Sequence, residues 1–272
     1  MKKIMLLIAF ILPFMTKAQN KKFDSYPVYA GKDLGLIYTH QQSAFRIWSP
    51  TAEKAELILY NDGTGGIALQ TIRMQKSKSG TWITSLPGDL KGKFYTFRVQ
   101  VNNEWLNEVP DPYAKAVAVN GRRAMIIDLK ETDPDDWGKD KSPVLKNATD
   151  AVIYELHIRD ASIAANSGLK HKGKYRGLTE KGTTNNEGLS TGLDHLKELG
   201  VTHIHLLPFY DFYSVDESKA EKLQYNWGYD PLNYNTPEGS YATNADDGVS
   251  RIKEMKQLVQ AFHLNGVDLV WM

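Results

Sequence analysis

Short segments of β-branched and aromatic residues, several of them alternating with polar positions, dominate the chain between about residues 23 and 130. An alternation with a period of two places successive side chains on opposite faces of a sheet. Turn-forming runs such as Asn61-Asp62-Gly63 separate the segments. No useful helical periodicity precedes about residue 186, so this region predicts an antiparallel β-sandwich. The predicted strands are 44–48, 55–60, 81–84 and 94–101.

The pattern changes after about residue 149, where strand-like and helix-like segments alternate. Apolar runs at 151–158, 201–207 and 267–272 predict buried strands. Between them, apolar residues at helical spacing predict two helices that end at Gly200 and Gly266. This alternation predicts a parallel sheet of the kind that begins a (β/α)8 barrel. The apolar positions are Leu189, Leu193, Leu196 and Leu199 in the first helix, and Val249, Ile252, Met255, Val259 and Phe262 in the second.

The N-terminus has the features of a signal peptide. Lys2-Lys3 is followed by an apolar run at 4–15 and by the small-residue end Thr16-Lys17-Ala18. A membrane anchor is disfavoured, because the run is well short of the roughly 20 residues that span a bilayer. We therefore expect cleavage after Ala18 and a secreted or periplasmic protein that does not associate with membrane afterwards. The predicted organisation is signal peptide 1–18, sandwich 19–130, polar linker 131–148 and α/β region 149–272.

Charge and cysteine content narrow the classes of partner. The 33 basic and 32 acidic residues give a net charge of +1, which provides no broad field to attract nucleic acid. The chain has no cysteine, so it has neither disulfides nor thiolate metal ligands. The balanced charge therefore favours partners that are themselves uncharged.

The run Tyr225-Asn226-Trp227-Gly228-Tyr229-Asp230-Pro231 carries the clearest chemistry. Aromatic faces stack on the C–H groups of a sugar ring, while amide, carboxylate and hydroxyl groups bind its hydroxyls. The loop is therefore a candidate saccharide-binding segment. The alternative is a tyrosine-rich loop packed over its own domain.

That run and the following Pro237-Glu238-Gly239-Ser240-Tyr241 resemble the signature loop of type I pullulanases, debranching enzymes of the α-amylase superfamily. The segment from Tyr154 to Asp160 resembles their first barrel strand, and Gly173 to Glu180 resembles the segment that follows it. Phe45 to Ala52 resembles the opening strand of the isoamylase-type carbohydrate-binding module that precedes the barrel. The resemblance implies an immunoglobulin-like β-sandwich followed by about the first three strands of a (β/α)8 barrel.

The resemblance also implies a function, the hydrolysis of α-1,6-glucosidic bonds of pullulan, starch or glycogen with retention. Retention needs two carboxyl groups about 5 Å apart. In the family, the catalytic residues follow the fourth, fifth and seventh barrel strands, beyond Met272 in this numbering. We therefore expect a truncated chain with no catalytic residue, which is inactive alone. No cofactor is predicted, and calcium is left open for full-length relatives.

Three residues are predicted to bind substrate. By resemblance, Tyr229 is the platform that stacks on the sugar at the cleavage point, and Trp227 and Asp230 shape the loop. In the sandwich, Trp48, Trp82 and Trp105 could form a sugar platform, but Trp48 and Trp82 lie on predicted strands and suit a core position, so no binding residue is assigned there.

No metal site is predicted. His203 and His205 share one side of a strand and could converge on a metal, but no third ligand occurs at a recognisable spacing. His157, beside Glu155, is expected to have a hydrogen-bonded structural role. Asp246 and Asp247 suit helix caps better than proton transfer.

Two alternatives remain beside the hypothesis of a debranching enzyme. One is a non-catalytic α-glucan-binding protein that uses only the sandwich. The other is a truncated gene product with no function of its own.

Overall fold

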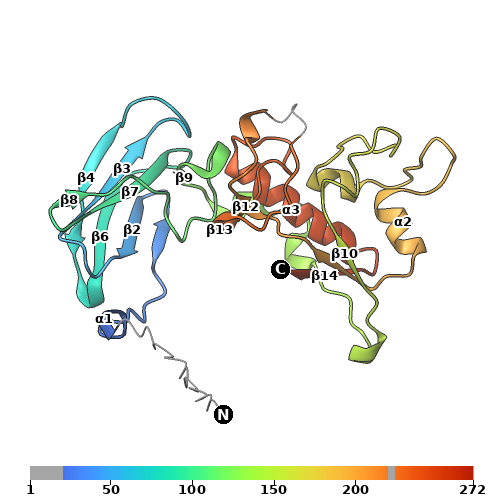
Figure 1. Cartoon of the computed structure of the whole chain (residues 1–272), viewed down its shortest axis with the longest axis horizontal. Helices are drawn as coiled ribbons and strands as arrows, with labels where there is room; N and C mark the ends of the chain where they lie inside the picture. Colours follow the sequence, from blue (N-terminus) through green and yellow to red (C-terminus); the bar gives the residue numbers. More distant parts are fainter. Residues whose placement is uncertain (1–20, 220–223, 272) are drawn as a thin grey trace, which may run out of the picture.

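The computed structural model describes residues 21–219 and 224–271, so the predicted signal peptide lies outside the described residues. A β-sandwich occupies one end of the molecule and the α/β part the other, and helix α3 (Gly248–His263) of the α/β part lies near the middle of the molecule (Figure 1). A short helix, α1 (Lys21–Asp24), precedes the sandwich. None of the described helices combines the length and apolar character needed to cross a bilayer.

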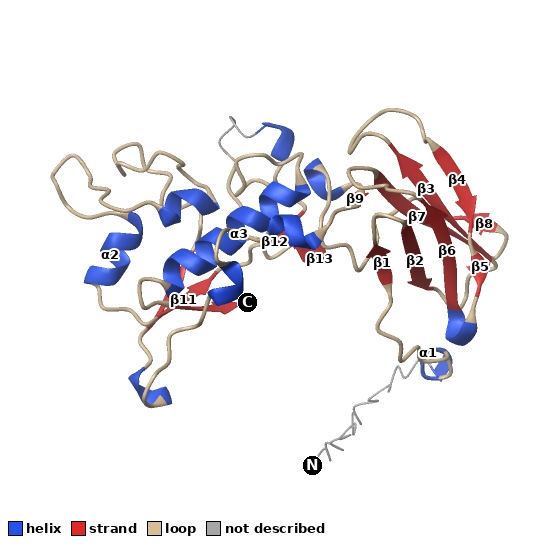
Figure 2. Ribbon diagram, turned by 180° about the vertical axis from the view of Figure 1, so that it is seen from behind, coloured by secondary structure: helices blue, strands red, loops and turns tan. Residues whose placement is uncertain are grey.

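The sandwich consists of two antiparallel sheets that pack face to face (Figure 2). One has the order β1-β2-β6-β5 and the other β4-β3-β7-β8, with β9 also paired to β7. Each predicted strand falls within an observed one, so the predicted sandwich is confirmed. The bounds are β1 Gly35–Tyr38, β2 Gln42–Trp48, β3 Lys54–Tyr60, β4 Gln70–Arg73, β5 Gln75–Lys76, β6 Thr81–Pro87, β7 Phe94–Val101, β8 Glu104–Trp105 and β9 Ala124–Met125.

Alternating residues of the two sheets form the core of the sandwich. Phe45 of β2, Leu57 of β3 and Phe97 of β7 are at most 1% exposed. Trp82 is also buried here, and its indole N–H donates to the carbonyl of Ser49 at 3.0 Å. Trp82 is thus a core residue, as its position on a predicted strand indicated. The same expectation was wrong for Trp48, which is 38% exposed and donates its indole N–H to the carbonyl of Pro27 at 3.0 Å.

The α/β part is built on a three-stranded parallel sheet with the order β10-β11-β14. Its strands are β10 (Ile153–Leu156), β11 (His203–Leu206) and β14 (Asp268–Trp271). Helix α2 (Gly192–Glu198) connects β10 to β11, and α3 leads into β14. The predicted β-sandwich followed by an α/β segment with three parallel strands is therefore confirmed.

Other elements complete the chain between these strands. The hairpin of β12 (Tyr210–Phe212) and β13 (Pro231–Pro237) frames the aromatic loop. The 3-10 helices are η1 Lys78–Gly80, η2 Val119–Gly121, η3 Leu129–Thr132, η4 Trp137–Lys139, η5 Ala148–Asp150, η6 Tyr175–Thr179 and η7 Glu217–Lys219.

Helix α2 is shorter than predicted. Leu193 and Leu196 are buried in it, but Leu189 precedes the helix and is 61% exposed. The side chain of Asn185 accepts the backbone N–H of Leu189 at 2.9 Å, which holds that residue in a turn. The prediction was wrong for Leu189 because this local hydrogen bond competes with helix formation. Leu199 is the helix C-cap and is exposed.

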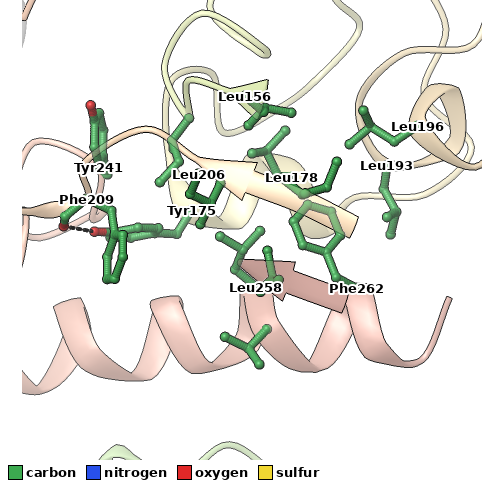
Figure 3. Close-up of a cluster of buried hydrophobic side chains, with 14 of the residues drawn as sticks. Leu156, Tyr175, Leu178, Leu193, Leu196, Leu206, Phe209, Tyr241, Leu258 and Phe262 are labelled. Atoms are coloured by element: carbon green, nitrogen blue, oxygen red, sulfur yellow. Dashed lines mark hydrogen bonds between the residues drawn. The ribbon is translucent and has the colours of Figure 1, made fainter. Parts of the chain in front are cut away.

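Helix α3 follows the prediction closely. Asp247 caps it by accepting the N–H groups of Val249 and Ser250, and Gly266 adopts a φ of +78° beyond its end. Its apolar face packs under the sheet. Leu258 and Phe262 lie close to Tyr175, Leu178 and Leu206 in this core (Figure 3).

The segment predicted as the linker lies against α3. Lys256 of α3 donates to Asp133 and to the hydroxyl of Thr132, and Gln260 donates to the carbonyl of Asp135 at 3.0 Å. Trp137 packs on the core of the α/β part. The first part of the segment is thus held by the α/β part.

Candidate functional site

The aromatic loop presents its rings to solvent. Tyr225, Trp227 and Tyr229 are 53%, 60% and 58% exposed. The rings of Tyr225 and Trp227 meet edge to face, with centroids 6.5 Å apart. Rings that pack over their own domain would be buried, whereas more than half of the surface of each of these residues is exposed, so this alternative is not supported.

A network of hydrogen bonds holds the backbone beneath these rings. The side-chain amide of Asn226 donates to Asp230 Oδ1 at 2.6 Å, and its oxygen accepts the N–H of Gly228 at 2.9 Å. Asp230 also accepts the hydroxyl of Ser214, and its carbonyl accepts the N–H of Tyr213 at 3.0 Å. The loop is therefore tied to the two residues that directly follow strand β12.

Glycine is required at position 228. Its φ is +86°, and a Cβ there would lie 2.6 Å from the carbonyl oxygen of Pro208. The turn that separates Trp227 from Tyr229 thus depends on the absence of a side chain.

Asp230 shapes this loop through an ionised carboxylate. Burial alone would raise its pKa, but the hydrogen bonds from Ser214 and Asn226 outweigh burial and hold the pKa below its usual value. The structure places Trp227, Tyr229 and Asp230 in one loop, as predicted. Their contact with substrate stays a prediction.

His157, at the end of β10, connects the first parallel strand to the aromatic loop. Its Nε2 lies 2.9 Å from the carbonyl oxygen of Asn226 and 3.0 Å from the hydroxyl of Tyr241. Its Nδ1 accepts the backbone N–H of Asp160 at 3.2 Å. The expected hydrogen-bonded role of His157 is confirmed, although its partners are these groups rather than Glu155.

The two histidines of β11 do not converge with a set of other potential metal ligands. His205 Nδ1 lies 3.8 Å from Glu155 Oε2, and His203 Nδ1 lies 2.8 Å from the hydroxyl of Thr202. Among the described residues, the group of three potential ligands that converge is formed elsewhere, by Asp211, Glu217 and Glu238.

That acidic cluster surrounds Arg251 of α3, whose side chain is fully buried. Arg251 donates to Asp211 Oδ1 at 3.0 Å, to Glu217 Oε2 at 2.5 Å and to the carbonyl of Ala118 at 3.1 Å. Glu238 accepts the N–H groups of Phe212 and Ser240. The carboxylates are thus already satisfied by a guanidinium and by backbone N–H groups.

The cluster also joins the two halves of the molecule. Glu217 accepts the N–H of Asn120 on the sandwich side and the N–H of Gly239 on the α/β side. Asn120 in turn accepts the N–H of Glu217 at 2.7 Å. One carboxylate therefore binds backbone from both halves.

Burial dominates the electrostatics of the cluster. It raises the pKa of Asp211 to about 6 against the attraction of Arg251, and together with the neighbouring Glu217 and Asp211 it raises the pKa of Glu238 well above its usual value. Sequence reasoning did not find this cluster. Its members come from four separate segments, and the only local sign is an arginine beside the buried Ile252 of α3.

Other carboxylates of the α/β part have structural partners or lie at the surface. Asp268 Oδ1 lies 3.1 Å from His263 Nε2, and Asp247 caps α3. Asp160 and Asp246 are exposed.

The sandwich matches a known module. The profile of carbohydrate-binding module 48 (isoamylase N-terminal domain) matches residues 33–114. Among curated proteins, the chain is 42% identical to the pullulanase of Bacillus subtilis, over 91% of the chain and 33% of that protein. It is 29% identical to chloroplastic pullulanase 1 of Arabidopsis thaliana, over 87% of the chain and 28% of that protein. The chain thus spans about a third of the length of these relatives.

Solved structures show the same likeness. Apo pullulanase of Paenibacillus barengoltzii superposes with a TM-score of 0.90 at 48% identity, over 93% of this chain and 39% of that chain. Pullulanase of Anoxybacillus sp. LM18-11, in complex with maltotetraose, superposes with a TM-score of 0.86 at 42% identity, over 93% of this chain and 36% of that one. In sequence and in fold the chain is therefore similar to the pullulanases over about nine-tenths of its length, and its residues 33–114 match the isoamylase N-terminal module.

Proposed function

We propose that this chain is the glucan-holding portion of an exported α-1,6-glucan debranching hydrolase of the retaining type, and that the 272-residue chain binds α-glucan without cleaving it. The observation that carries the proposal is the set of exposed aromatic rings at Tyr225, Trp227 and Tyr229 on a loop fixed by Asn226 and Asp230. A ring held in place loses little entropy when a sugar stacks on it.

The ligand class is supported by chemistry and by the relatives. Exposed rings with phenolic hydroxyls suit a neutral polyol better than an ion. Solved pullulanases hold maltotriose in one complex, and maltohexaose with α-cyclodextrin in another. We therefore infer α-glucan polysaccharides, namely pullulan, starch or glycogen, as partners of this chain.

The absence of cleavage is inferred from the carboxyl groups of the described residues. Retaining hydrolysis needs two carboxyl groups about 5 Å apart that face the scissile bond. The converging carboxylates of Asp211, Glu217 and Glu238 are buried around Arg251, where no sugar can reach them. They support a structural role and not a catalytic one.

Export is proposed from the sequence of the N-terminus. The charged, apolar and small-residue parts of residues 1–18 support cleavage after Ala18. Expression in a bacterial host and mass measurement of the exported product tests this. A mature protein that begins at Gln19 is expected, and retention of the first 18 residues would contradict export.

Affinity electrophoresis in gels that contain pullulan tests the function. We expect the migration of the wild-type chain to be retarded, and we expect Tyr229→Ala to weaken binding at least about tenfold, about 1.4 kcal/mol. Phe23→Ala removes a ring that is 66% exposed on α1 and serves as the matched control. Reducing-end release from pullulan should stay at background. Retardation equal to that of a non-binding protein, or measurable turnover, would reject the proposal.

A second candidate function, glucan binding by the sandwich alone, is favoured by Trp105. This ring is 37% exposed at the β7–β8 hairpin, and the guanidinium of Arg98 lies 4.8 Å from its centroid. Arg98 is itself held by Glu56 at 2.7 Å. If Trp105→Ala abolishes retardation while Tyr229→Ala does not, the sandwich is the binding site.

A further inference from the structure

We propose that His157 positions the aromatic loop for glucan binding, by holding the backbone of Asn226 through its Nε2–H. The proposal rests on the proposed function of this loop and assigns a role to a residue outside it. His157 follows β10, so it connects the parallel sheet to a segment about seventy residues further along the chain.

The imidazole ring makes two contacts with the aromatic loop. Nε2 lies 2.9 Å from the carbonyl oxygen of Asn226, and the ring centroid lies 5.5 Å from that of Tyr225. The ring is 7% exposed and is flanked on its other side by Tyr241, whose ring it meets edge to face at 5.8 Å. The imidazole is therefore fixed between the loop and the core of the α/β part.

The hydrogen-bond partners select one form of the ring. Nδ1 accepts the backbone N–H of Asp160, so it carries no hydrogen. The hydrogen of a neutral imidazole then lies on Nε2. A carbonyl oxygen can only accept, so Nε2–H donates to Asn226. The hydroxyl oxygen of Tyr241, 3.0 Å from Nε2, then lies on the acceptor side of the same N–H.

The position of Asn226 controls the rest of the loop. Its side chain binds both Asp230 and the N–H of Gly228. Its backbone must therefore be held in place for the turn between Trp227 and Tyr229 to keep its shape. His157 supplies this support although it touches neither Trp227 nor Tyr229 in the described contacts.

Two variants of similar shape test the role of the N–H group. His157→Gln keeps an N–H donor on a flexible side chain of similar reach, whereas His157→Met has similar length and no donor. We expect His157→Met to weaken maltohexaose binding about tenfold or more in calorimetry, and His157→Gln to remain within about threefold of wild type. His195→Leu, which replaces an exposed histidine of α2, is the control and should bind as wild type.

Amide hydrogen exchange provides a readout that does not depend on the ligand. The N–H of Gly228 should exchange at least about tenfold faster in His157→Met than in wild type, and at a near wild-type rate in His157→Gln. Equal exchange and equal affinity in wild type and His157→Met would overturn the proposal. If wild type does not bind maltohexaose, the proposed function fails, and the exchange of Gly228 still decides the role of His157. If His157→Met does not fold, a folded His157→Gln that loses both affinity and protection of Gly228 overturns it.

Discussion

The two halves of the molecule bury polar groups in different ways. The core of the sandwich is apolar, and its main buried polar contact is the hydrogen bond from Tyr95 to Asp111 at 2.7 Å. The α/β part instead buries a guanidinium and several carboxylates around Arg251. The sandwich is thus stabilised chiefly by apolar burial, whereas the α/β part also depends on an ion network at its border with the sandwich.

This difference affects how each half responds to substitution. A large-to-small substitution in an apolar core lowers the free energy of unfolding through lost burial and a cavity, and its structural effect is local. Removal of one member of a buried ion network leaves the other members charged and unpaired, which costs more than the pair contributed. Because Arg251 also binds the carbonyl of Ala118, damage to the network should reach both halves.

The largest effect is expected from Arg251→Met. Loss of the guanidinium leaves Asp211 and Glu217 without their cation, and we expect the free energy of unfolding of the α/β part to fall by about 3–5 kcal/mol. Chemical denaturation with region-resolved hydrogen exchange measures this. Arg176→Met, at an exposed arginine, is the matched control. A loss below about 1 kcal/mol, or one that does not reach residues 118–120, would show that the network does not join the halves.

A core substitution in the sandwich should have a more local effect. Leu57 is fully buried on β3, and Leu57→Ala should cost about 3 kcal/mol through lost burial and a cavity. The same exchange experiment should show faster opening in residues 35–125 and an unchanged α/β part. If the α/β part opens equally, the halves unfold as one unit and the comparison fails.

The sequence was sufficient to predict the sandwich because its long strands are rich in β-branched and aromatic residues and are separated by turn-forming runs, and β2 also alternates with a period of two. The strands β1, β4, β5, β8 and β9 are two to four residues long, too short to show that period. Helix α3 was predictable for the same kind of reason, since its apolar face persists over 16 residues. The prediction failed at Leu189 because the hydrogen bond from its backbone N–H to the side chain of Asn185 cannot be read from the spacing of apolar residues.

The candidate site was only partly predictable. The aromatic loop is continuous in the sequence, so its composition reveals it. His157 and Arg251 act on residues remote in the chain, at Asn226 and at Asp211, and only the folded chain brings these pairs together. Contacts of this kind leave no periodic pattern.

The pH dependence of stability should distinguish the network from the apolar core. The pKa of Asp211 is raised to about 6 in the folded protein, against 3.8 in the unfolded chain, so between these values the folded state retains a proton that the unfolded state has lost. The stability of the α/β part should therefore fall as the pH rises from about 4 to about 6, by no more than about 1.4 kcal/mol per pH unit for one group. Denaturant titrations at several pH values measure the slope.

Asp211→Asn is the control for that slope. It removes the titration of Asp211, so the fall in stability between about pH 4 and about pH 6 should become shallower than in wild type, while the contribution of Glu238, whose pKa is also raised, remains. A slope that persists unchanged in this variant, or a stability that rises with pH in wild type over the same window, would mean that Asp211 is not the group responsible.

The smallest effects are expected in the segment 129–140, which connects the two halves. Substitution of Lys256 and of Lys139 tests which half this segment unfolds with. Lys256 is 17% exposed, binds Thr132 and Asp133, and lies 5.4 Å from the ring of Trp137, so Lys256→Met should cost about 1 kcal/mol. Lys139 pairs with Asp136 at the surface, where both side chains are more than two-thirds exposed, and Lys139→Ala should change stability by less than about 0.5 kcal/mol. Hydrogen exchange of residues 129–140 should accelerate only in Lys256→Met, together with α3. Acceleration together with the sandwich strands instead would place this segment in the other half.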